Sequence, residues 1–497
     1  MTLQQLLPSL PMARPSGSMD DEVVALTADS RQVKPGTLFF AHRGTKMDAH
    51  QFIPQALTQG AIGIVAETPV PVDHHGPWIE VKDAPLALGL AANVFHGQPS
   101  LDLQVAGVTG TNGKTTIAFI IQHLIARNKG RCGMLGTIRY DLGNQEILPA
   151  SHTTPDSVEL HRLLAAIRDN GCAGVAMEVS SHAIDQQRIA GIEFDAAVFT
   201  NLTQDHLDYH RSMDAYFEAK ARLFEQLRRQ VVKKSACMVI NIDDPAGKKL
   251  AERHLDWKSL TTYGMSFAAD FRVTDITTTI ATTQFHLLIG GRSLLVRLPL
   301  IGRFNVFNAV AALAAVHGMG YNLRESIQSL AETPQVPGRL QSVGNQRNFR
   351  VFVDYAHTPD ALENVLKTLR DLTPRRIITI FGCGGDRDTT KRPLMGAIAE
   401  RLSDHVILTS DNPRSEPPEQ ILRDIEQGMH GGNSTKIVDR AEAIAFAVME
   451  LLRDGDILLI AGKGHEDYQI FADQTIAFDD VKVAARCLRD RKFATDS

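Results

Sequence analysis

The third of three zones along the chain has the most regular pattern of hydrophobic and polar positions. Apolar runs of strand length recur there at 351–353, 377–381, 406–408 and 457–460. Between the first two runs, apolar residues are spaced to bury one face of a helix, at Ala361, Leu362, Val365, Leu366 and Leu369. Strands that alternate with helices predict an α/β fold with a parallel, doubly wound sheet.

Each apolar run of this zone is followed by an unusual polar cluster. The clusters occupy residues 354–357, 382–387, 411–414 and 462–467. In open α/β sheets, ligands bind outside the carboxyl ends of the strands. Four clusters in the same register therefore predict one binding site at that edge of the sheet.

The two earlier zones are less regular. The first, to about residue 100, mixes short strands with helical stretches, and the second opens with an apolar strand at 105–108. Residues 285–289 and 293–298 predict a hairpin about Gly290-Gly291-Arg292, and the small apolar residues of 308–316 predict a buried helix. Pro- and Gly-containing breaks near residues 97–100 and 333–338 predict three domains, at 1–100, 101–335 and 336–497.

Composition and charge narrow the functional classes. The 497 residues include 52 Lys and Arg against 57 Asp and Glu, which lacks the basic excess of a nucleic-acid binder. Five widely spaced cysteines form no C-x-x-C pair, which favours a reducing compartment over disulfides or structural zinc. The N-terminus does not resemble a signal peptide, and no apolar run is long enough to span a bilayer. We therefore expect a cytoplasmic protein.

The sharpest local motif is the glycine-rich segment 107–116, which follows the strand at 105–108 and precedes a helical stretch at 117–125. Its glycines allow backbone N–H groups to approach phosphate oxygens, Lys114 can neutralise charge, and Thr115 can offer a hydroxyl to Mg²⁺. The first glycine lies one residue earlier than in a strict P-loop. The alternative is a strand-to-helix turn that carries a surface lysine.

Two further polar segments, 178–182 and 200–210, also follow strand-like runs, at 174–177 and 196–199. Glu178 and His206 are candidates to share a divalent ion near the phosphates. Each alone is more often a structural group, and it is the neighbouring phosphate loop that favours the metal.

These motifs together resemble the Mur ligase family. The matching segments are GTNGKTT (110–116), MEVSSH (177–182), FTNLTQDHLDYH (199–210), GRFNVFNAV (302–310), PGR (337–339), VDYAHTPDAL (353–362), GCGGDRD (382–388), DNPR (411–414) and GKGHEDYQ (462–469). Asp29-Ser30-Arg31 and residues 35–39 extend the match. The resemblance implies an N-terminal α/β UDP-binding domain, a central P-loop ATPase-like domain with a mostly parallel sheet, and a C-terminal Rossmann-like domain.

The resemblance also implies a reaction. Within the family, the motif combination is most similar to ligases that add meso-diaminopimelate to UDP-N-acetylmuramoyl-L-alanyl-D-glutamate in peptidoglycan biosynthesis. ATP phosphorylates a carboxylate of the UDP-sugar peptide, the incoming amine attacks the acyl phosphate, and ADP and phosphate are released with Mg²⁺ as cofactor. Such an enzyme needs no nucleic acid and no membrane insertion, and we expect a monomer.

Residue by residue, the resemblance implies four groups. Catalytic roles fall on Lys114, Lys220, His206 and Arg339. ATP binding falls on Gly110, Thr111, Asn112, Gly113, Lys114, Thr115, Thr116, Asn305, Asn308, Arg339 and Asp354, and metal binding on Thr115, Glu178, His206 and Lys220 as a carbamate. The residues implied to bind the UDP-sugar peptide are Ala28, Ser30, Thr45, Thr153, Thr154, Ser180, Gln186 and Arg188. The residues implied to bind diaminopimelate are Arg387, Asp411, Asn412, Pro413, Arg414, Gly462 and Glu466.

Some positions depart from the family pattern or stay open. Ala49 stands where glycine is common, and Gln341 stands where an acidic residue is common. His357 and His465 are either general bases or residues that shape their loops.

Three other functions compete with this prediction. They are a sister ligase that adds L-lysine, a folylpolyglutamate synthetase-like ligase, and a nucleotide-hydrolysing switch. The four polar clusters of the third zone argue against a switch, because a switch needs no second binding site of that kind.

Overall fold

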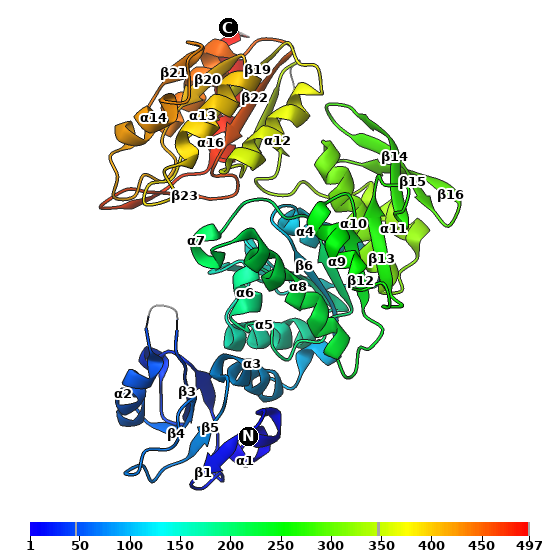
Figure 1. Ribbon diagram of the computed structural model, residues 1–497. Coiled ribbons are helices and arrows are strands. Elements are labelled where there is room, and N and C mark those ends of the chain that lie inside the picture. Colours follow the sequence, from blue (N-terminus) through cyan, green and yellow to red (C-terminus); the bar gives the residue numbers. More distant parts are fainter. Residues whose placement is uncertain (45–46, 345–347, 496–497) are drawn as a thin grey trace. The chain divides into compact units, whose positions relative to one another are not determined.

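A computed structural model of the chain describes residues 1–44, 47–344 and 348–495, so the contact predicted at Thr45 lies outside the described residues. Figure 1 colours the chain from blue at the N-terminus to red at the C-terminus. The chain divides into two compact units. The first unit comprises Met1–Arg272 and Asn308–Ser329, and the second comprises Val273–Phe307 and Leu330–Ser497. The division into three domains at residues 100 and 335 stays a prediction.

The first unit begins with a five-stranded sheet in the order β1-β5-β4-β3-β2. Its strands are β1 (Arg14–Ser16), β2 (Ala25–Thr27), β3 (Thr37–Ala41), β4 (Ala61–Ala66) and β5 (Trp78–Glu80). β2 to β5 run parallel, and β1 is antiparallel to β5. The main helix, α3 (Ala84–Phe95), begins where Asp83 accepts a hydrogen bond from the Leu86 N–H, and it buries Ala87 and Leu88 against this sheet.

A second sheet of the first unit is built around β6 (Gln104–Thr109), which lies between β10 (Gly174–Glu178) and β11 (Ala196–Phe199). All five residues from Val105 to Thr109 are buried, as expected for a strand covered on both faces. The parallel strands β7 (Cys132–Leu135), β12 (Cys237–Asn241) and β13 (Leu260–Gly264) extend the sheet, and β8 (Arg139–Asp141) and β9 (Ile147–Pro149) add antiparallel strands.

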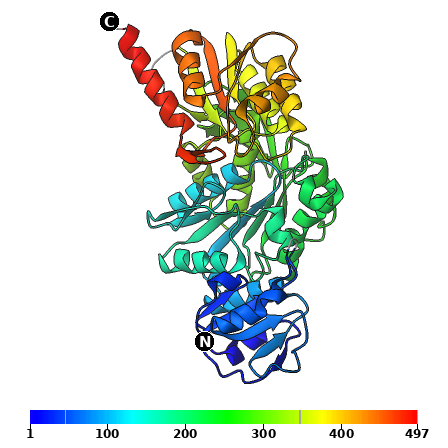
Figure 2. The same cartoon turned by 90° about the vertical axis from the view of Figure 1, so that its left-hand side faces the viewer.

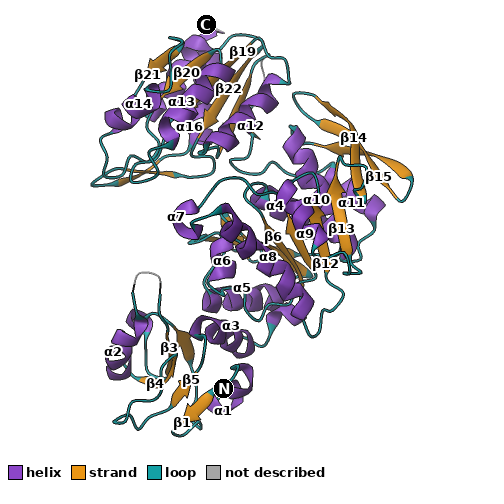
Figure 3. Ribbon diagram, viewed as in Figure 1, coloured by secondary structure: helices purple, strands orange, loops and turns teal. Residues whose placement is uncertain are grey.

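Helices connect these strands (Figure 3). They are α4 (Lys114–Asn128), α5 (Ser157–Asp169), α6 (Ser181–Asp185), α7 (Leu207–His210), α8 (Met213–Arg229) and α9 (Pro245–Glu252). Two further helices, α10 (Arg303–Gly318) and α11 (Leu323–Leu330), come later in the chain, after β16 (Arg292–Leu298). Short helices α1 (Leu3–Leu6) and α2 (Ile53–Thr58) accompany the N-terminal sheet. The predicted buried helix is confirmed in α10, whose residues from Ala309 to Val316 are at most 1% exposed.

The second unit contains the predicted hairpin, formed by β15 (Thr283–Ile289) and β16 (Arg292–Leu298) after β14 (Phe271–Thr278). The turn is shorter than the sequence suggested, because Arg292 already pairs with Ile289. Gly290 and Gly291 alone make the turn, with φ of +53° and +75°. Two consecutive left-handed residues give the tight turn whose twist matches the flanking strands.

The second unit is dominated by a six-stranded sheet in the order β17-β18-β22-β19-β20-β21. The strands are β17 (Gln341–Ser342), β18 (Arg350–Asp354), β19 (Arg376–Phe381), β20 (His405–Leu408), β21 (Ser434–Lys436) and β22 (Asp456–Ala461). All neighbours are parallel except β17 and β18. This arrangement confirms the predicted doubly wound sheet.

Successive residues of these strands enter different hydrophobic cores. Phe352 packs with α12 (Pro359–Arg370), α13 (Lys391–Leu402) and α14 (Pro418–Glu426). Val351 and Val353 pack with α15 (Arg440–Phe446) and α16 (Asp480–Thr495), the red helix in Figure 2. This alternation explains why the strands read as continuous apolar runs, because both of their faces are covered. A small antiparallel pair, β23 (Tyr468–Ile470) and β24 (Thr475–Ala477), completes the unit.

Two predictions from composition can be compared with the structure. The five cysteines are all buried and free, and no disulfide joins them in the part of the chain that the structure describes. No described helix is both long and apolar enough to cross a membrane.

Candidate active site

The glycine-rich loop lies between β6 and the first turn of α4, where the sequence predicted it. Gly110 has a φ of +141°, and a Cβ there would lie 1.8 Å from the Thr200 hydroxyl oxygen, so only glycine fits. Thr200 Oγ1 donates to the Asn112 carbonyl at 2.6 Å, and the Asn112 N–H donates to Asn201 Oδ1 at 2.9 Å. The segment after β11 therefore fastens the loop to the sheet.

Lys114 folds back over this loop. Its Nζ donates to the carbonyl oxygens of Gly110 and Thr111, at 3.0 and 2.8 Å. At the same turn of the helix, Thr115 and Thr116 are buried, and a Cβ on Gly113 would lie 2.5 Å from Asn308 Oδ1. The predicted phosphate-binding residues are thus gathered at one helix N-terminus, where backbone N–H groups favour an anion.

Glu178, at the end of β10, lies beside the loop in the neighbouring strand. Its Oε2 accepts a hydrogen bond from Thr115 Oγ1 at 3.0 Å, and its Oε1 accepts one from the Thr137 N–H at 2.8 Å. Thr137 Oγ1 also donates to Glu178 Oε2 at 3.1 Å and contacts Thr153 Oγ1 at 3.0 Å. The structure brings these hydroxyl and carboxylate oxygens together, and such hard donors are the ligands that Mg²⁺ prefers.

Thr137 was missed by sequence reasoning. It follows β7, whose Leu135 pairs with Met177 of β10, so parallel register carries it to the end of β10. The available signal was a threonine soon after a strand, as at Thr200. That signal becomes useful only once the order of the strands is known.

Lys220 of α8 is buried, with 1% of its surface exposed, and its Nζ donates to the Gly110 carbonyl at 2.7 Å. The Nζ atoms of Lys220 and Lys114 therefore donate to the same carbonyl oxygen. Burial and, after it, the positive charge of Lys114 lower the pKa of Lys220 well below its usual range. This side chain is thus biased toward the neutral, nucleophilic amine.

His206 stands in a cluster of rings beside α8. Its backbone is left-handed, with a φ of +53°, its side chain is 48% exposed, and its ring centroid lies 4.9 Å from that of His182. Among the described residues, no three His, Cys, Asp or Glu side chains form a metal-binding group. A shared ion at Glu178 and His206 stays a prediction.

The residues predicted to hold the UDP-sugar peptide form two groups. Thr154 Oγ1 donates to the Glu178 carbonyl at 2.9 Å and accepts from the Ser180 N–H at 3.1 Å. Arg188 donates to the Thr154 carbonyl at 2.9 Å and, through two nitrogens, to Gln186 Oε1. The structure therefore brings these residues together beside Glu178, whereas Ala28 and Ser30 lie in the N-terminal sheet region, where Ser30 Oγ contacts Gln55.

In the second unit, the four polar clusters follow β18, β19, β20 and β22, as predicted. Parallel register pairs Asp354 with Ala461 and Phe381 with Leu408, which brings the ends of these strands to one edge. The clusters pack so tightly that a Cβ on Gly385 would lie 1.8 Å from the Pro413 carbonyl oxygen. The Gly385 N–H donates to the Asn412 carbonyl at 2.9 Å and joins two of the loops.

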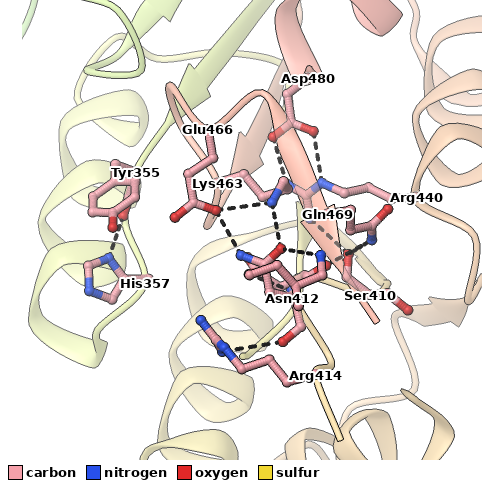
Figure 4. A network of polar contacts seen from close by, with 12 residues as sticks. Tyr355, His357, Ser410, Asn412, Arg414, Arg440, Lys463, Glu466, Gln469 and Asp480 are labelled. Atoms are coloured by element: carbon pink, nitrogen blue, oxygen red, sulfur yellow. Dashed lines mark hydrogen bonds and ion pairs between the residues drawn. The ribbon is translucent and has the colours of Figure 1, made fainter. Parts of the chain in front are cut away.

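Arg414 lies in the loop after β20, and one of its guanidinium nitrogens donates hydrogen bonds to the protein. Its Nη1 donates to the Gly385 carbonyl oxygen at 2.8 Å. The same nitrogen donates to the Asn412 carbonyl oxygen at 3.4 Å (Figure 4). Its Nε and Nη2 donate to no acceptor in the part of the chain that the structure describes. Arg387 is exposed and contacts the Asp386 carbonyl at 3.3 Å. Two nitrogens of Arg414 therefore stay available for a ligand carboxylate.

The remaining predicted residues of the second unit have mainly structural contacts here. Both carboxylate oxygens of buried Asp354 accept backbone N–H groups, from Leu340 at 2.7 Å and Ala356 at 2.8 Å. Asn305 donates to the Ile301 carbonyl at 2.9 Å. The Arg339 guanidinium lies 4.9 Å from the centre of the Tyr355 ring. Their roles toward ATP stay predictions.

His357 and His465, the two candidate general bases, lie near Tyr355. His357 Nδ1 contacts the Tyr355 carbonyl at 2.8 Å, which holds the loop after β18. Burial, and then the charges of Arg339 and Lys463, lower the pKa of His465 to about 4. His465 is therefore neutral at neutral pH.

A buried ion pair that was not predicted from the sequence contacts the chain beside the edge where the four polar clusters lie. Arg440 and Asp480 open α15 and α16, have no exposed side-chain surface, and make two hydrogen bonds of 2.8 Å. Arg440 also donates to the carbonyls of Ser410 and Ala461, at 3.4 and 3.0 Å (Figure 4). The pair thus holds the chain just before the 411–414 and 462–467 loops.

Removing Asp480 should strongly destabilise this unit. Asp480→Ala leaves the Arg440 guanidinium buried without its carboxylate, a change that costs about 3–5 kcal/mol. Hydrogen exchange of the β22 amides measures the free energy of opening at this place. As the control, Glu426→Ala removes the exposed pair with Lys436 and should cost less than about 1 kcal/mol. Equal effects of the two substitutions would contradict a stabilising role for the buried pair.

Comparison with known proteins agrees with this geometry. Family models for the "Mur ligase family, catalytic domain", the "Mur ligase middle domain" and the "Mur ligase, glutamate ligase domain" match residues 22–96, 108–316 and 338–464. The chain is 44% identical to the UDP-N-acetylmuramoyl-L-alanyl-D-glutamate–2,6-diaminopimelate ligase of Geobacillus thermodenitrificans, over 99% of this chain and 100% of that one. It is also 44% identical to the ligase of the same name from Halalkalibacterium halodurans, over 95% of each.

A solved structure of a ligase with this name is also similar. It has a TM-score of 0.72 and 34% sequence identity, and the match covers 99% of both chains. The similarity therefore extends over the whole length of the chain.

Proposed function

The chain belongs to the Mur ligase family, and from this premise we propose that it adds meso-diaminopimelate to UDP-N-acetylmuramoyl-L-alanyl-D-glutamate. It is an ATP-dependent ligase that forms an amide bond in peptidoglycan biosynthesis. The choice of diaminopimelate as the amino-acid substrate rests on the geometry of Arg414. Two of its guanidinium nitrogens donate to no acceptor among the described residues and can bind the distal carboxylate.

The reaction needs a carboxylate to be activated, because hydroxide is a poor leaving group. The D-glutamate carboxylate attacks the terminal phosphorus of ATP, which gives an acyl phosphate and ADP. The amine of diaminopimelate then attacks the acyl carbon, phosphate leaves, and a proton is lost from nitrogen. We assign the positioning of the phosphates to residues 110–116, since Lys114 and the N–H groups at the start of α4 supply positive charge.

The oxygen donors Thr115 Oγ1 and Glu178 Oε2, 3.0 Å apart, fit Mg²⁺. Bound Mg²⁺ would neutralise negative charge on the phosphate groups. We propose that Thr115 holds a first Mg²⁺, that Glu178 and His206 hold a second, and that carbamylated Lys220 supplies a further oxygen ligand for Mg²⁺. We assign Arg188, Gln186 and Thr154 to the UDP-sugar peptide. Arg188 suits an anion, since it is pre-oriented by Gln186 and the Thr154 carbonyl.

The alternatives differ in the acceptor. L-lysine lacks the distal carboxylate, so it would leave Arg414 unpaired. A folylpolyglutamate synthetase-like ligase would need another acceptor pocket, and the full-length relatives with 44% identity favour the diaminopimelate ligase over both. We further propose that the enzyme is cytoplasmic and acts as a monomer. If it is a monomer, it should elute from gel filtration at the mass of one chain.

One assay tests the proposed function. The protein is incubated with ATP, Mg²⁺ and UDP-N-acetylmuramoyl-L-alanyl-D-glutamate, single amino acids are added, and phosphate release and amide product are followed. We expect ADP and phosphate in step with product when meso-diaminopimelate is present. Preference for L-lysine, or formation of AMP, would contradict the proposal.

We expect Lys220 to carry a carbamate. Its neutral amine attacks carbon dioxide at carbon, which yields Lys–NH–COO⁻ and one released proton. The product is an anionic oxygen ligand where an ammonium would repel Mg²⁺. Lys220→Ala should lower kcat by about 10²-fold or more, and ¹³C-labelled carbon dioxide should give a carbamate signal in wild type alone.

A short carboxylic acid such as formate should restore part of the activity of Lys220→Ala by supplying the missing oxygen ligand. Lys258→Ala removes an exposed lysine of the same unit and should behave as wild type. Unmodified lysine in a liganded crystal structure would disprove the carbamate.

A further inference from the structure

Lys463 is a buried cation between two of the loops that follow the second-unit sheet. It comes two residues after β22, and none of its side-chain surface is exposed. Its Nζ donates to Asn412 Oδ1 at 3.0 Å and to Glu466 Oε2 at 3.0 Å (Figure 4). The cation therefore contacts two residues assigned to the amino-acid pocket, although its own side chain is closed off from solvent.

The three side chains form a closed ring of hydrogen bonds. Asn412 Nδ2 donates to Glu466 Oε2 at 2.8 Å, and the Ile470 N–H donates to Asn412 Oδ1 at 3.1 Å. Oδ1 thus accepts from an ammonium and a backbone amide, which an –NH₂ group in its place could not do. The orientation of the Asn412 amide is therefore fixed, and with it the donor aimed at Glu466.

The two carboxylate oxygens of Glu466 are unequal as a result. Oε2 receives two hydrogen bonds, from Lys463 and Asn412, whereas Oε1 accepts none from the described residues. The Glu466 side chain keeps 16% of its surface exposed. One oxygen is thus committed to the protein, and the other is left for a donor from outside.

We propose that Lys463 is a positioning and specificity-determining residue, which fixes Glu466 so that Oε1 alone receives the distal ammonium of the amino-acid substrate. This inference rests on the proposed function. Without Lys463, the Glu466 carboxylate can rotate, and its charge is no longer shared with a buried partner. Recognition of the ammonium should then weaken, while recognition of the distal carboxylate at Arg414 stays.

The test compares two substrates that differ only in the distal amine, meso-diaminopimelate and 2-aminopimelate. For each variant, the ratio of their kcat/KM values is measured, which cancels any loss of folded protein. We expect wild type to favour meso-diaminopimelate by about a hundredfold, since an unpaired buried charge is costly. Lys463→Met should reduce this ratio by about tenfold and leave the KM values for ATP and the UDP-sugar peptide unchanged.

Three further variants sharpen the test. Lys367→Met removes a surface lysine that pairs with Glu363 on α12, and it should leave the ratio unchanged. In a Glu466→Gln background, Lys463→Met should change the ratio no further, because the charge that it positions is already gone. If Lys463→Met does not yield soluble protein, Lys463→Gln, which keeps a donor without the charge, takes its place.

The outcomes separate this inference from the proposed function. If wild type adds no diaminopimelate, the proposed function fails before any variant is compared. If wild type adds it but does not favour it over 2-aminopimelate, or if Lys463→Met keeps the wild-type ratio, Lys463 does not position Glu466 for the ammonium. A reduced ratio in Lys463→Met alone, absent in the Glu466→Gln background, supports it.

Discussion

Replacing Lys114 with alanine will reduce kcat by about 10³-fold while the fold is retained. The ammonium lies at the phosphate loop, and an oriented cation that stabilises developing charge accounts for an effect of this size. We expect the substitution to cost the folded state little, because each hydrogen bond that Nζ donates to the carbonyls of Gly110 and Thr111 is worth about 1 kcal/mol. Phosphate release and the thermal midpoint measure the two effects separately.

Lys248→Ala is the matched control, because Lys248 is an exposed lysine on α9 of the same unit. Its activity and thermal midpoint should equal those of wild type. If Lys114→Ala keeps more than a tenth of the wild-type kcat, the loop does not use this lysine for phosphoryl transfer.

Replacing Arg414 with alanine will lower kcat/KM for meso-diaminopimelate by about 10³-fold, because the distal carboxylate loses its partner. L-lysine has no such carboxylate, so its much lower kcat/KM should change little. Arg414→Lys should recover only part of the loss, since a point charge cannot make two parallel hydrogen bonds. The backbone φ at this position is +53°. This left-handed conformation strains arginine, lysine and alanine alike, so the kcat/KM values of the three proteins can be compared directly.

Arg387→Ala is the companion variant. Arg387 is exposed and lies on the neighbouring loop, so its loss should have a smaller effect on the choice of amino acid. If Arg414→Ala keeps the wild-type preference for meso-diaminopimelate and Arg387→Ala does not, the distal carboxylate binds Arg387 instead.

Local sequence patterns predicted the elements that carry both sites. The run at 196–199 coincides with β11, and the runs at 377–381 and 457–460 lie inside β19 and β22. Because β18, β19, β20 and β22 are buried on both faces, their apolar runs are continuous and the ends of the runs are easily recognised. Glycine and proline marked the turns, although the hairpin at Gly290 closed one residue earlier than expected.

Contacts between distant elements could not be predicted in the same way. Lys220 reaches the Gly110 carbonyl from 110 residues away, and Arg440 meets Asp480 across 40 residues. Thr137 reaches Glu178 because β7 is the parallel neighbour of β10. Strand order is not encoded in local periodicity, since a crossover helix can carry the chain to either side of an existing strand.

The sequence by itself therefore determined the α/β class, the phosphate loop, and the four polar clusters at the ends of the second-unit strands. Hydrophobic spacing and glycine positions are local properties that need no knowledge of neighbours. Only the tertiary structure decided which charges became buried and which oxygens stayed free. Lys463 reads as an ordinary loop lysine until packing closes it off beside Asn412 and commits one oxygen of Glu466, because burial and hydrogen-bond partners arise only when separate strands meet.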